Sequence, residues 1–246
     1  KVSAIVLAGA PNNGKLEAAF PQKYEALIPL QGRPLVAWVV EALAASGQVE
    51  EIIVVGPQAQ LQEALGADWP PKGKIVQSAD TLLGNLQLGA AASGERLLVV
   101  TSDLPLLKPE IVDDFLTKAE RAGVSLYYPI VSREDTFAMF PEAERTFIRL
   151  KDGTFTGGNL VYMEKSVLSQ MSGLFQQVIA ARKKPWRLVK ILGGAFILSF
   201  LLRTLSIAKI ERRAQELGLN AKAVIMRQPE VGFDVDKPQD FTAIVR

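Results

Sequence analysis

The stretch LLVVTSDLPLL, residues 97–107, decides the fold. Its first four residues are apolar without alternation, which is typical of a strand buried on both faces of a sheet. A lone carboxylate would be costly inside that strand and Pro105 cannot donate a ladder hydrogen bond, so we place Asp103 just past the carboxyl end of the strand. Ligands of open α/β sheets bind beside that end. Asp103 is therefore a candidate ligand-binding residue, although an aspartate in a turn or helix cap fits the same position.

The composition limits the chemistry that the chain can perform. With 246 residues, 48% of them hydrophobic, it is long enough for a large α/β domain with a sizeable core. It contains no cysteine and no histidine, which excludes disulfides, zinc clusters, thiol nucleophiles and imidazole bases. A bound metal must then be a hard cation on oxygen ligands, which favours Mg²⁺. The net charge of +2 gives no reason to expect a nucleic-acid partner, and because no signal peptide is recognisable we expect a cytoplasmic protein.

Buried apolar runs alternate with helical patterns through the first half of the chain. This alternation is typical of a parallel sheet with helices packed on both faces. We expect strands at residues 2–8, 51–56, 75–77, 97–101 and 126–131, and helices at residues 35–46, 82–92 and 109–122.

The pattern changes after residue 132. Residues 133–147 look irregular, and Asp152-Gly153 predicts a hairpin turn between strands 146–150 and 155–163, a small antiparallel meander beside the parallel sheet. The remaining elements that we expect are a mostly helical region at 165–218, a strand at 221–227 and a closing helix after Pro238. We predict a single domain over residues 1–246 with two halves, 1–131 and 132–246.

The first strand runs into the small-residue loop GAPNNGK, residues 9–15, which we call the glycine loop. Such a loop lets backbone amides approach a phosphate closely. The spacing from Gly9 to Gly14 and Lys15 matches a P-loop, but Leu16 stands where that motif needs Ser or Thr, and Pro21 interrupts the helix that should follow. A plain connecting loop and a nucleotide-cradling loop of another kind are the alternatives.

One long apolar run lies in the second half. Twelve residues without a charge, 191–202 from Ile191 to Leu202, lie between Lys190 and Arg203. A transmembrane helix needs about 20 residues, so we expect no membrane span. The run fits a buried helix or an interface of a homo-oligomer, and a membrane-surface contact is the alternative.

Five stretches together resemble a known family. They are LAGA at 7–10, ALIPLQGRPLV at 26–36, the helix at 82–89, VVTSDLPLL at 99–107 and GFDVDKP at 232–238. In this order they resemble the nucleotidyltransferase family A superfamily, in particular the MobA-like NTP transferases. That group includes molybdopterin guanylyl- and cytidylyltransferases and the sugar-phosphate and isoprenoid nucleotidyltransferases.

The resemblance implies a fold and a reaction. The fold would be nucleotide-diphospho-sugar transferase-like: a Rossmann-like, mostly parallel sheet with a C-terminal helical elaboration. Residues 1–131 would bind the nucleotide and residues 132–246 the acceptor. The reaction would be a Mg²⁺-dependent transfer of NMP from an NTP to a small phosphorylated acceptor, with release of pyrophosphate.

The resemblance also implies roles for individual residues. Asp103 and Asp236 would hold the metal, and Asp234 is less suited. Two carboxylates from distant segments can clamp one hard cation, although Asp236 alone would equally fit a helix N-cap. The residues that would line the nucleotide are Ala8, Gly9, Ala10, Gly14, Gly84, Asn85 and Ser102. Those that would meet the acceptor are Thr156, Gly157, Gly158 and Asn159.

Glu25 departs from the family pattern, because the superfamily usually carries a lysine at this position, just before the A-L-x-P-L run. Lys15, Lys23 or Arg33 must then meet the phosphates, and we expect Lys15 or Lys23 as catalytic residues with Glu25 outside the site. A non-catalytic nucleotide-binding or regulatory protein is the rival that Glu25 favours. A P-loop phosphohydrolase is the rival that Leu16 disfavours.

Overall fold

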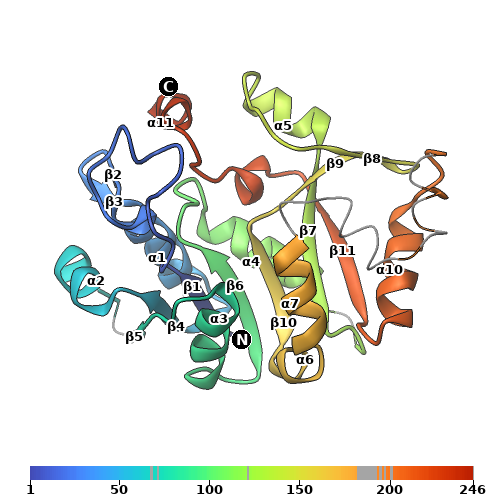
Figure 1. Cartoon of the computed structure of the whole chain (residues 1–246), viewed down its shortest axis with the longest axis horizontal. Coiled ribbons are helices and arrows are strands. Elements are labelled where there is room, and N and C mark those ends of the chain that lie inside the picture. Colours follow the sequence, from blue (N-terminus) through green and yellow to red (C-terminus); the bar gives the residue numbers. More distant parts are fainter. Residues whose placement is uncertain are drawn as a thin grey trace.

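A computed structural model describes residues 1–66, 69–70, 72–120, 122–181, 193, 196, 198–199 and 202–245. Within these residues a nine-stranded sheet runs through the molecule (Figure 1). Its strands, in spatial order, are β5 (Gly73–Gln77), β4 (Val49–Gly56), β1 (Val2–Leu7), β6 (Arg96–Thr101), β10 (Leu160–Glu164), β7 (Leu126–Ser132), β9 (Gly153–Gly157) and β8 (Ile148–Leu150), with β11 (Ala221–Met226) paired to β7.

The first half of the sheet is parallel, as the sequence predicts. β1 pairs in parallel with β4 and with β6, and β4 pairs in parallel with β5. Alternate residues of β1 enter different cores: Ala4 and Val6 pack in one cluster and Ile5 in another. A strand with both faces buried in this way explains why its sequence is apolar without alternation.

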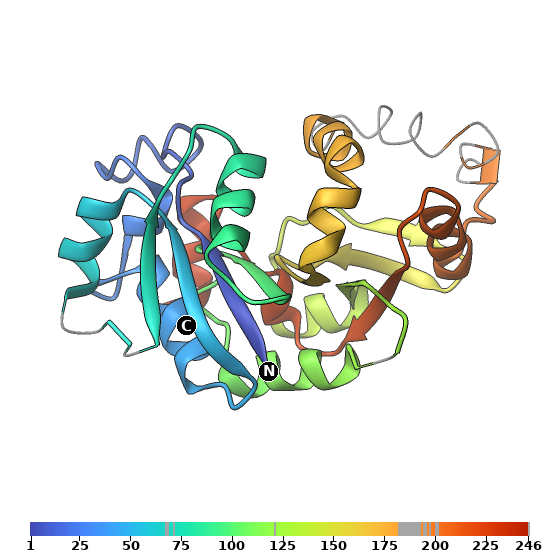
Figure 2. The same cartoon turned by 90° about the horizontal axis from the view of Figure 1, so that it is seen from below.

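Helices cover both faces of the sheet (Figure 2). Figure 2 shows α1 (Leu35–Ala45) and α4 (Pro109–Lys118) on one face, and α3 (Leu82–Ala91) and α6 (Lys165–Gln170) on the other. α4 is shorter than the helix predicted at 109–122, since it ends at Lys118. The other helices of the first half are α2 (Gln58–Leu65) and the 3-10 turn η1 (Glu25–Leu27), which precedes the small hairpin β2 (Pro29–Leu30) and β3 (Arg33–Pro34).

The predicted irregular stretch 133–147 is partly wrong, because it contains a helix. α5 (Arg133–Met139) follows β7 directly. The Ser132 hydroxyl accepts from the Asp135 amide at 2.9 Å and donates to the Asp135 carboxylate at 2.6 Å. This spacing of a serine and an acidic residue three positions later is a helix-start signal that was available in the sequence.

The predicted strand 155–163 is wrong as one continuous strand. The stretch is divided into β9 and β10, and both strands pair with the same edge of β7. β10 lies antiparallel between β6 and β7, so the meander belongs to the central sheet and is not a separate layer beside it. The break, residues 158–159, therefore lies at the carboxyl end of β6, next to the segment of Asp103.

The C-terminal part returns to the first half of the molecule. α7 (Ser172–Ala181) and α10 (Ile207–Glu216) confirm helix in the region 165–218, and β11 leads through the 3-10 turn η3 (Pro229–Gly232) to α11 (Pro238–Val245). Most of the apolar run from Ile191 to Leu202 lies outside the described residues. Among the helices that are described, none is both long and apolar enough to cross a membrane.

Candidate active site

Asp103 lies just past the carboxyl end of β6, where the sequence places it. Thr101 and the backbone amide of Asp103 itself hydrogen-bond to the carboxyl group. The Oδ1 atom is buried and, within the described residues, has no hydrogen-bond partner. Burial raises the pKa of Asp103 to about 7, and the nearby charges of Asp234 and Glu25 add to this shift. A buried, unsatisfied carboxylate oxygen is costly, so this atom is suited to a cationic ligand.

The tail after η3 brings two more carboxylates to Asp103. The Val235 amide donates to the backbone oxygen of Asp103 at 3.0 Å. The Val235 side chain is buried in a cluster with Leu16 and Ile28. Because successive side chains of an extended segment point to opposite sides, Asp234 and Asp236 point away from that cluster.

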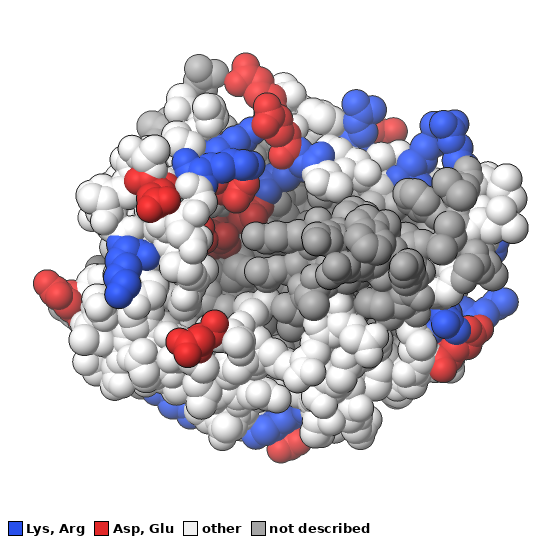
Figure 3. All heavy atoms as spheres, in the orientation of Figure 1, with Lys and Arg blue, Asp and Glu red and all other residues white. Residues whose placement is uncertain are grey.

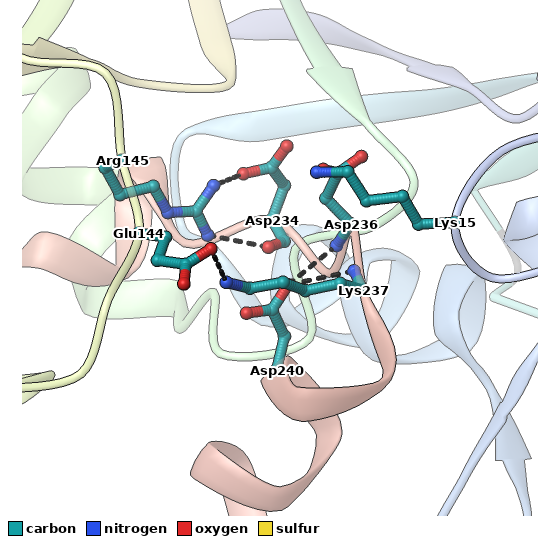
Figure 4. Close-up of polar contacts among 7 residues, drawn as sticks. All are labelled: Lys15, Glu144, Arg145, Asp234, Asp236, Lys237 and Asp240. Carbon is teal, nitrogen blue, oxygen red and sulfur yellow. Dashed lines mark hydrogen bonds and ion pairs between the residues drawn. The ribbon is translucent and has the colours of Figure 1, made fainter.

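The two tail carboxylates have different partners (Figure 4). Arg145 binds Asp234 twice, through the carboxylate and through the backbone oxygen at 2.7 Å. The Asp236 Oδ2 atom lies 2.9 Å from Lys15 Nζ, and both side chains of that pair are largely exposed. Sequence reasoning missed Arg145, which lies in the stretch predicted to be irregular. No motif marks it, since its role depends on a partner 89 residues away.

The alternative role of Asp236 was to cap the N-terminus of α11, but Asp240 binds the backbone amides there. Asp240 accepts the backbone amides of Asp236 and Lys237, each at 3.0 Å. The Lys237 ammonium pairs with Glu144 at 2.6 Å. Acidic and basic side chains therefore gather around the tail, in the upper part of the face shown in Figure 3.

Glu25 lies within range of the charges of these acidic groups, whereas we expected it outside the site. It is half-buried, and burial together with the charges of Asp236 and Asp234 raises its pKa. Lys23 is exposed with its ammonium 5.6 Å from the centre of the Tyr24 ring. The predicted catalytic lysines are thus separated: Lys15 reaches the acidic groups, whereas Lys23 contacts its own neighbour.

Arg33 is also turned away from the site. Its guanidinium pairs with Glu41 at 2.8 Å and lies over the Trp38 ring. Both contacts are with α1. Lys15, Lys23 and Arg33 were the three basic residues considered for phosphate binding. Among the described contacts, that of Lys15 with Asp236 is the one that reaches the tail carboxylates.

The glycine loop is not a P-loop. Residues 14–19 form turns rather than the helix that a P-loop opens, and Leu16 is buried in the cluster with Val235. The Asn12 side chain donates to the backbone oxygens of Phe20 and Gln22, both at 3.0 Å, which closes the loop on itself. Gly14 is exposed, and a Cβ added there would meet nothing within 4 Å.

The glycine loop contacts α3, the helix that carries Gly84 and Asn85, through Gly9. A Cβ at Gly9 would lie 2.9 Å from Nδ2 of Asn85, so the two segments are in contact. Asn85 is only 6% exposed, and its Oδ1 accepts the Ala79 amide at 2.7 Å, which gives it a structural role as well. Gly84 donates to the Thr81 hydroxyl that caps α3. The remaining nucleotide candidates flank these segments: Ala8 and Ser102 are buried, and the Ala10 oxygen accepts the Glu25 amide.

The predicted acceptor segment lies beside both Asp103 and the tail. The Asn159 oxygen accepts the Thr101 amide at 3.1 Å, and the Asn159 amide donates to Val231 at 2.8 Å. Gly158 is confined, because a Cβ there would lie 2.8 Å from the Pro129 ring and 3.1 Å from the Val231 oxygen. The structure thus brings together four regions that carry predicted site residues: the glycine loop, Asp103, the broken strand and the tail.

This fold, together with the family match of most of the chain, defines the class, the nucleotidyltransferases. A solved structure described as a hypothetical transferase from Thermus thermophilus is 39% identical, covers 98% of this chain and 99% of its own, and superposes with a TM-score of 0.85. A CMP:2-keto-3-deoxy-manno-octonic acid synthetase complexed with CTP has a TM-score of 0.65 over 99% of this chain and 97% of its own, at 12% identity, and so shares the fold alone.

The family follows from the sequence match. Residues 20–214 match the MobA-like NTP transferase domain, and the chain belongs to that family. Bifunctional protein GlmU of Geobacter metallireducens is 28% identical over 140 residues, which are 55% of this chain and 29% of GlmU. A probable molybdenum cofactor guanylyltransferase of Thermococcus gammatolerans is 29% identical over 105 residues, which are 42% of this chain and 52% of that protein. The chain thus spans only part of the length of these relatives.

Proposed function

We propose that this protein is a Mg²⁺-dependent nucleotidyltransferase that transfers NMP from an NTP to a small phosphorylated acceptor. An oxygen of the acceptor phosphate bonds to the α-phosphorus, the bond from that phosphorus to the β-phosphate oxygen breaks, and pyrophosphate leaves. The observation that carries the proposal is the buried Oδ1 of Asp103, which lies near the tail and the broken strand and has no hydrogen-bond partner among the residues that the structure describes. The names of similar proteins, which include a guanylyltransferase and a synthetase complexed with CTP, support nucleotide transfer.

The residues present suit a magnesium ion. Asp103 and Asp236 would hold it, while Arg145 keeps Asp234 in place beside them. Within the described residues no group of three or more acidic side chains is placed to hold a metal alone. Mg²⁺ does not need one, because it is commonly bound by one or two carboxylates together with substrate phosphates and water. When bound, it would neutralise the triphosphate and orient it for in-line attack.

The protein groups would position the two substrates on either side of Asp103. The glycine loop offers its backbone to the nucleotide, and Lys15 lies close enough to Asp236 to exchange that carboxylate for a phosphate. Residues 156–159 would hold the acceptor phosphate. No covalent enzyme intermediate is needed, which suits a chain without cysteine or histidine.

A panel of NTPs, each with and without Mg²⁺, tests the proposal by thermal shift and by pyrophosphate release in the presence of phosphorylated acceptors. We expect one nucleotide to raise the melting temperature by mass action, and Asp103→Asn to abolish the Mg²⁺-dependent part while the fold is kept. Asp114→Asn is the matched control, because that carboxylate pairs with Lys118 on α4. An unchanged Mg²⁺ titration in Asp103→Asn would contradict the assignment.

A non-catalytic nucleotide-binding protein is the second candidate, and the position of Glu25 favours it. A carboxylate within range of the charges of Asp236 and Asp234 adds negative charge where we propose that a triphosphate binds. The same panel separates the two functions: this candidate binds a nucleotide without releasing pyrophosphate for any acceptor. The cytoplasmic location, the single-domain division and a homo-oligomer stay predictions.

A further inference from the structure

A pocket of about 300 Å³ lies next to the acceptor segment, between α10 and the strands β7, β8, β9 and β11. Thr156 and Gly157 form part of its wall. α10 lies beside β11 on the right of Figure 1 and presents Ile207, Ile210 and Ala214 to the pocket. These residues recur at the spacing of one helix face, yet each stays only partly buried. The apolar face of α10 therefore covers the sheet without filling the space beneath it.

The pocket offers apolar surface and no free charge. The two charged residues among those that line it are Glu211 and Lys222, and they pair with each other at 2.7 Å. The second oxygen of Glu211 accepts the Ala223 amide at 3.0 Å. Both charges are thus neutralised within the wall. A ligand of this pocket must be recognised by its hydrocarbon surface.

Tyr128 connects the pocket to the acidic site. Its ring lines the pocket, and its hydroxyl lies so close over Gly157 that a Cβ there would overlap it. Although 42% of Tyr128 is exposed, desolvation of its hydroxyl and then the charge of Asp234 raise the pKa of Tyr128. Thr156 and Gly157 therefore belong both to the wall of the pocket and to the segment 156–159 proposed to hold the acceptor phosphate, so a molecule bound at that segment can extend into the pocket.

We propose that this pocket receives an apolar group of the acceptor, which makes the acceptor an amphipathic phosphate with its phosphate at residues 156–159. The inference rests on the proposed function, because the acceptor role of those residues belongs to it. The pocket is of adequate size: an engineered apolar cavity of about 150 Å³ binds benzene, so this volume accommodates a larger hydrocarbon group.

Straight-chain alkyl phosphates are the probes. Ethyl, butyl, hexyl and octyl phosphate are titrated into the full chain by calorimetry, below the concentrations at which they form micelles. We expect the affinity to rise roughly twofold to fourfold per added methylene until the pocket is full. Ala214→Phe, which places a ring in the pocket, should remove this dependence on chain length. Ala208→Phe, on the exposed side of the same helix, should keep it.

The possible outcomes are distinct. Equal affinities for all four phosphates, or a chain-length dependence that survives in a folded Ala214→Phe, would overturn the inference. A concentration-dependent dimer in sedimentation that Ala214→Phe disrupts, with no gain from longer chains, would assign the pocket to a second copy instead. Nucleotide binding is measured on the same samples. If nucleotide binding is intact while the chain-length effect is absent, the pocket proposal alone fails. If nucleotide binding is absent while the effect is present, the proposed function fails, and the pocket remains a site for amphipathic phosphates without a role in nucleotide transfer.

Discussion

Lys15 Nζ lies 2.9 Å from Asp236 Oδ2, and this ion pair joins the glycine loop to the tail across 221 residues of sequence. The side chains are 67% and 61% exposed, so the pair is accessible to a competing ligand. The hydrogen bond and the negative charge of Asp236 raise the pKa of Lys15, so the ammonium group stays charged. A nucleotide with its metal offers both partners a replacement: phosphate for Lys15 and a cation for Asp236.

Lys15→Ala should weaken NTP binding without changing the melting temperature. Exposed ion pairs contribute little to stability, whereas loss of one charge contact to a phosphate should lower the affinity by at least about fivefold. Calorimetric titration with the NTP selected by the panel measures this. Lys74→Ala is the control, because that lysine also pairs with a carboxylate but does so at the opposite end of the strands, at Glu51. Equal affinities of the two variants would place the phosphates elsewhere.

Asp103→Asn should stabilise the metal-free protein, and increasingly so as the pH rises. The pKa of Asp103 is about 7 when folded, whereas that of an unfolded aspartate is about 4, so between these values the folded state binds more protons. Folding stability due to this group is thus present at low pH and lost as the pH rises through that window. Asparagine does not titrate and escapes the loss.

Thermal unfolding in EDTA between pH 4.5 and 8.5 measures this difference. One unit of pKa shift corresponds to about 1.4 kcal/mol. That free energy raises the melting temperature by about 3–6 °C for a domain of this size, so we expect at least that gain at pH 8. The control Asp114→Asn should show no such trend. A difference between Asp103→Asn and the parent that stays constant with pH would show that burial does not favour the protonated form.

Glu25→Lys should tighten metal-free binding of an NTP. The charges of Asp236 and Asp234 act on Glu25, so its own charge should oppose a triphosphate bound beside them. Exchange of a repulsive for an attractive charge near 4 Å changes the free energy by at least about 1.4 kcal/mol, or tenfold in affinity. Glu17→Lys makes the same charge change at an exposed position in the turn that follows the glycine loop. If both variants bind alike, the effect is one of net charge and Glu25 has no special place.

Gly158→Ala should destabilise the fold by about 1–3 kcal/mol, because the new methyl group meets the Pro129 ring and the Val231 oxygen. It should also reduce activity, since it separates the broken strand from the tail. Gly173→Ala is the control: nothing lies within 4 Å of its added Cβ, and alanine is favoured in α7. Urea unfolding of both variants measures the difference. Equal stability would mean that the break can relax without cost.

The sequence predicted the parallel half of the sheet because each of its strands carries its own signal. A run such as Val2–Leu7 must be buried on both faces whatever its neighbours are. The position of β10 between β6 and β7 could not be predicted from its own sequence, because an apolar run indicates burial but not which strands lie beside it. Asp103 was proposed from its position after a buried strand, and the tail was proposed from the family resemblance. Arg145 and the inward position of Glu25 were not, because both depend on which distant side chains meet.

The closure of the glycine loop on the tail also sets the order of assembly. Leu16 and Val235 share one apolar cluster, and Phe20 and Phe241 have ring centres 4.6 Å apart. These contacts join the beginning of the chain to its far end, and contacts across so long a separation form late because the intervening loop must be closed first. During synthesis the parallel sheet can form early, but its first loop must wait until residue 241 has emerged. The ribosome-bound chain therefore carries a folded scaffold before it has a complete active site.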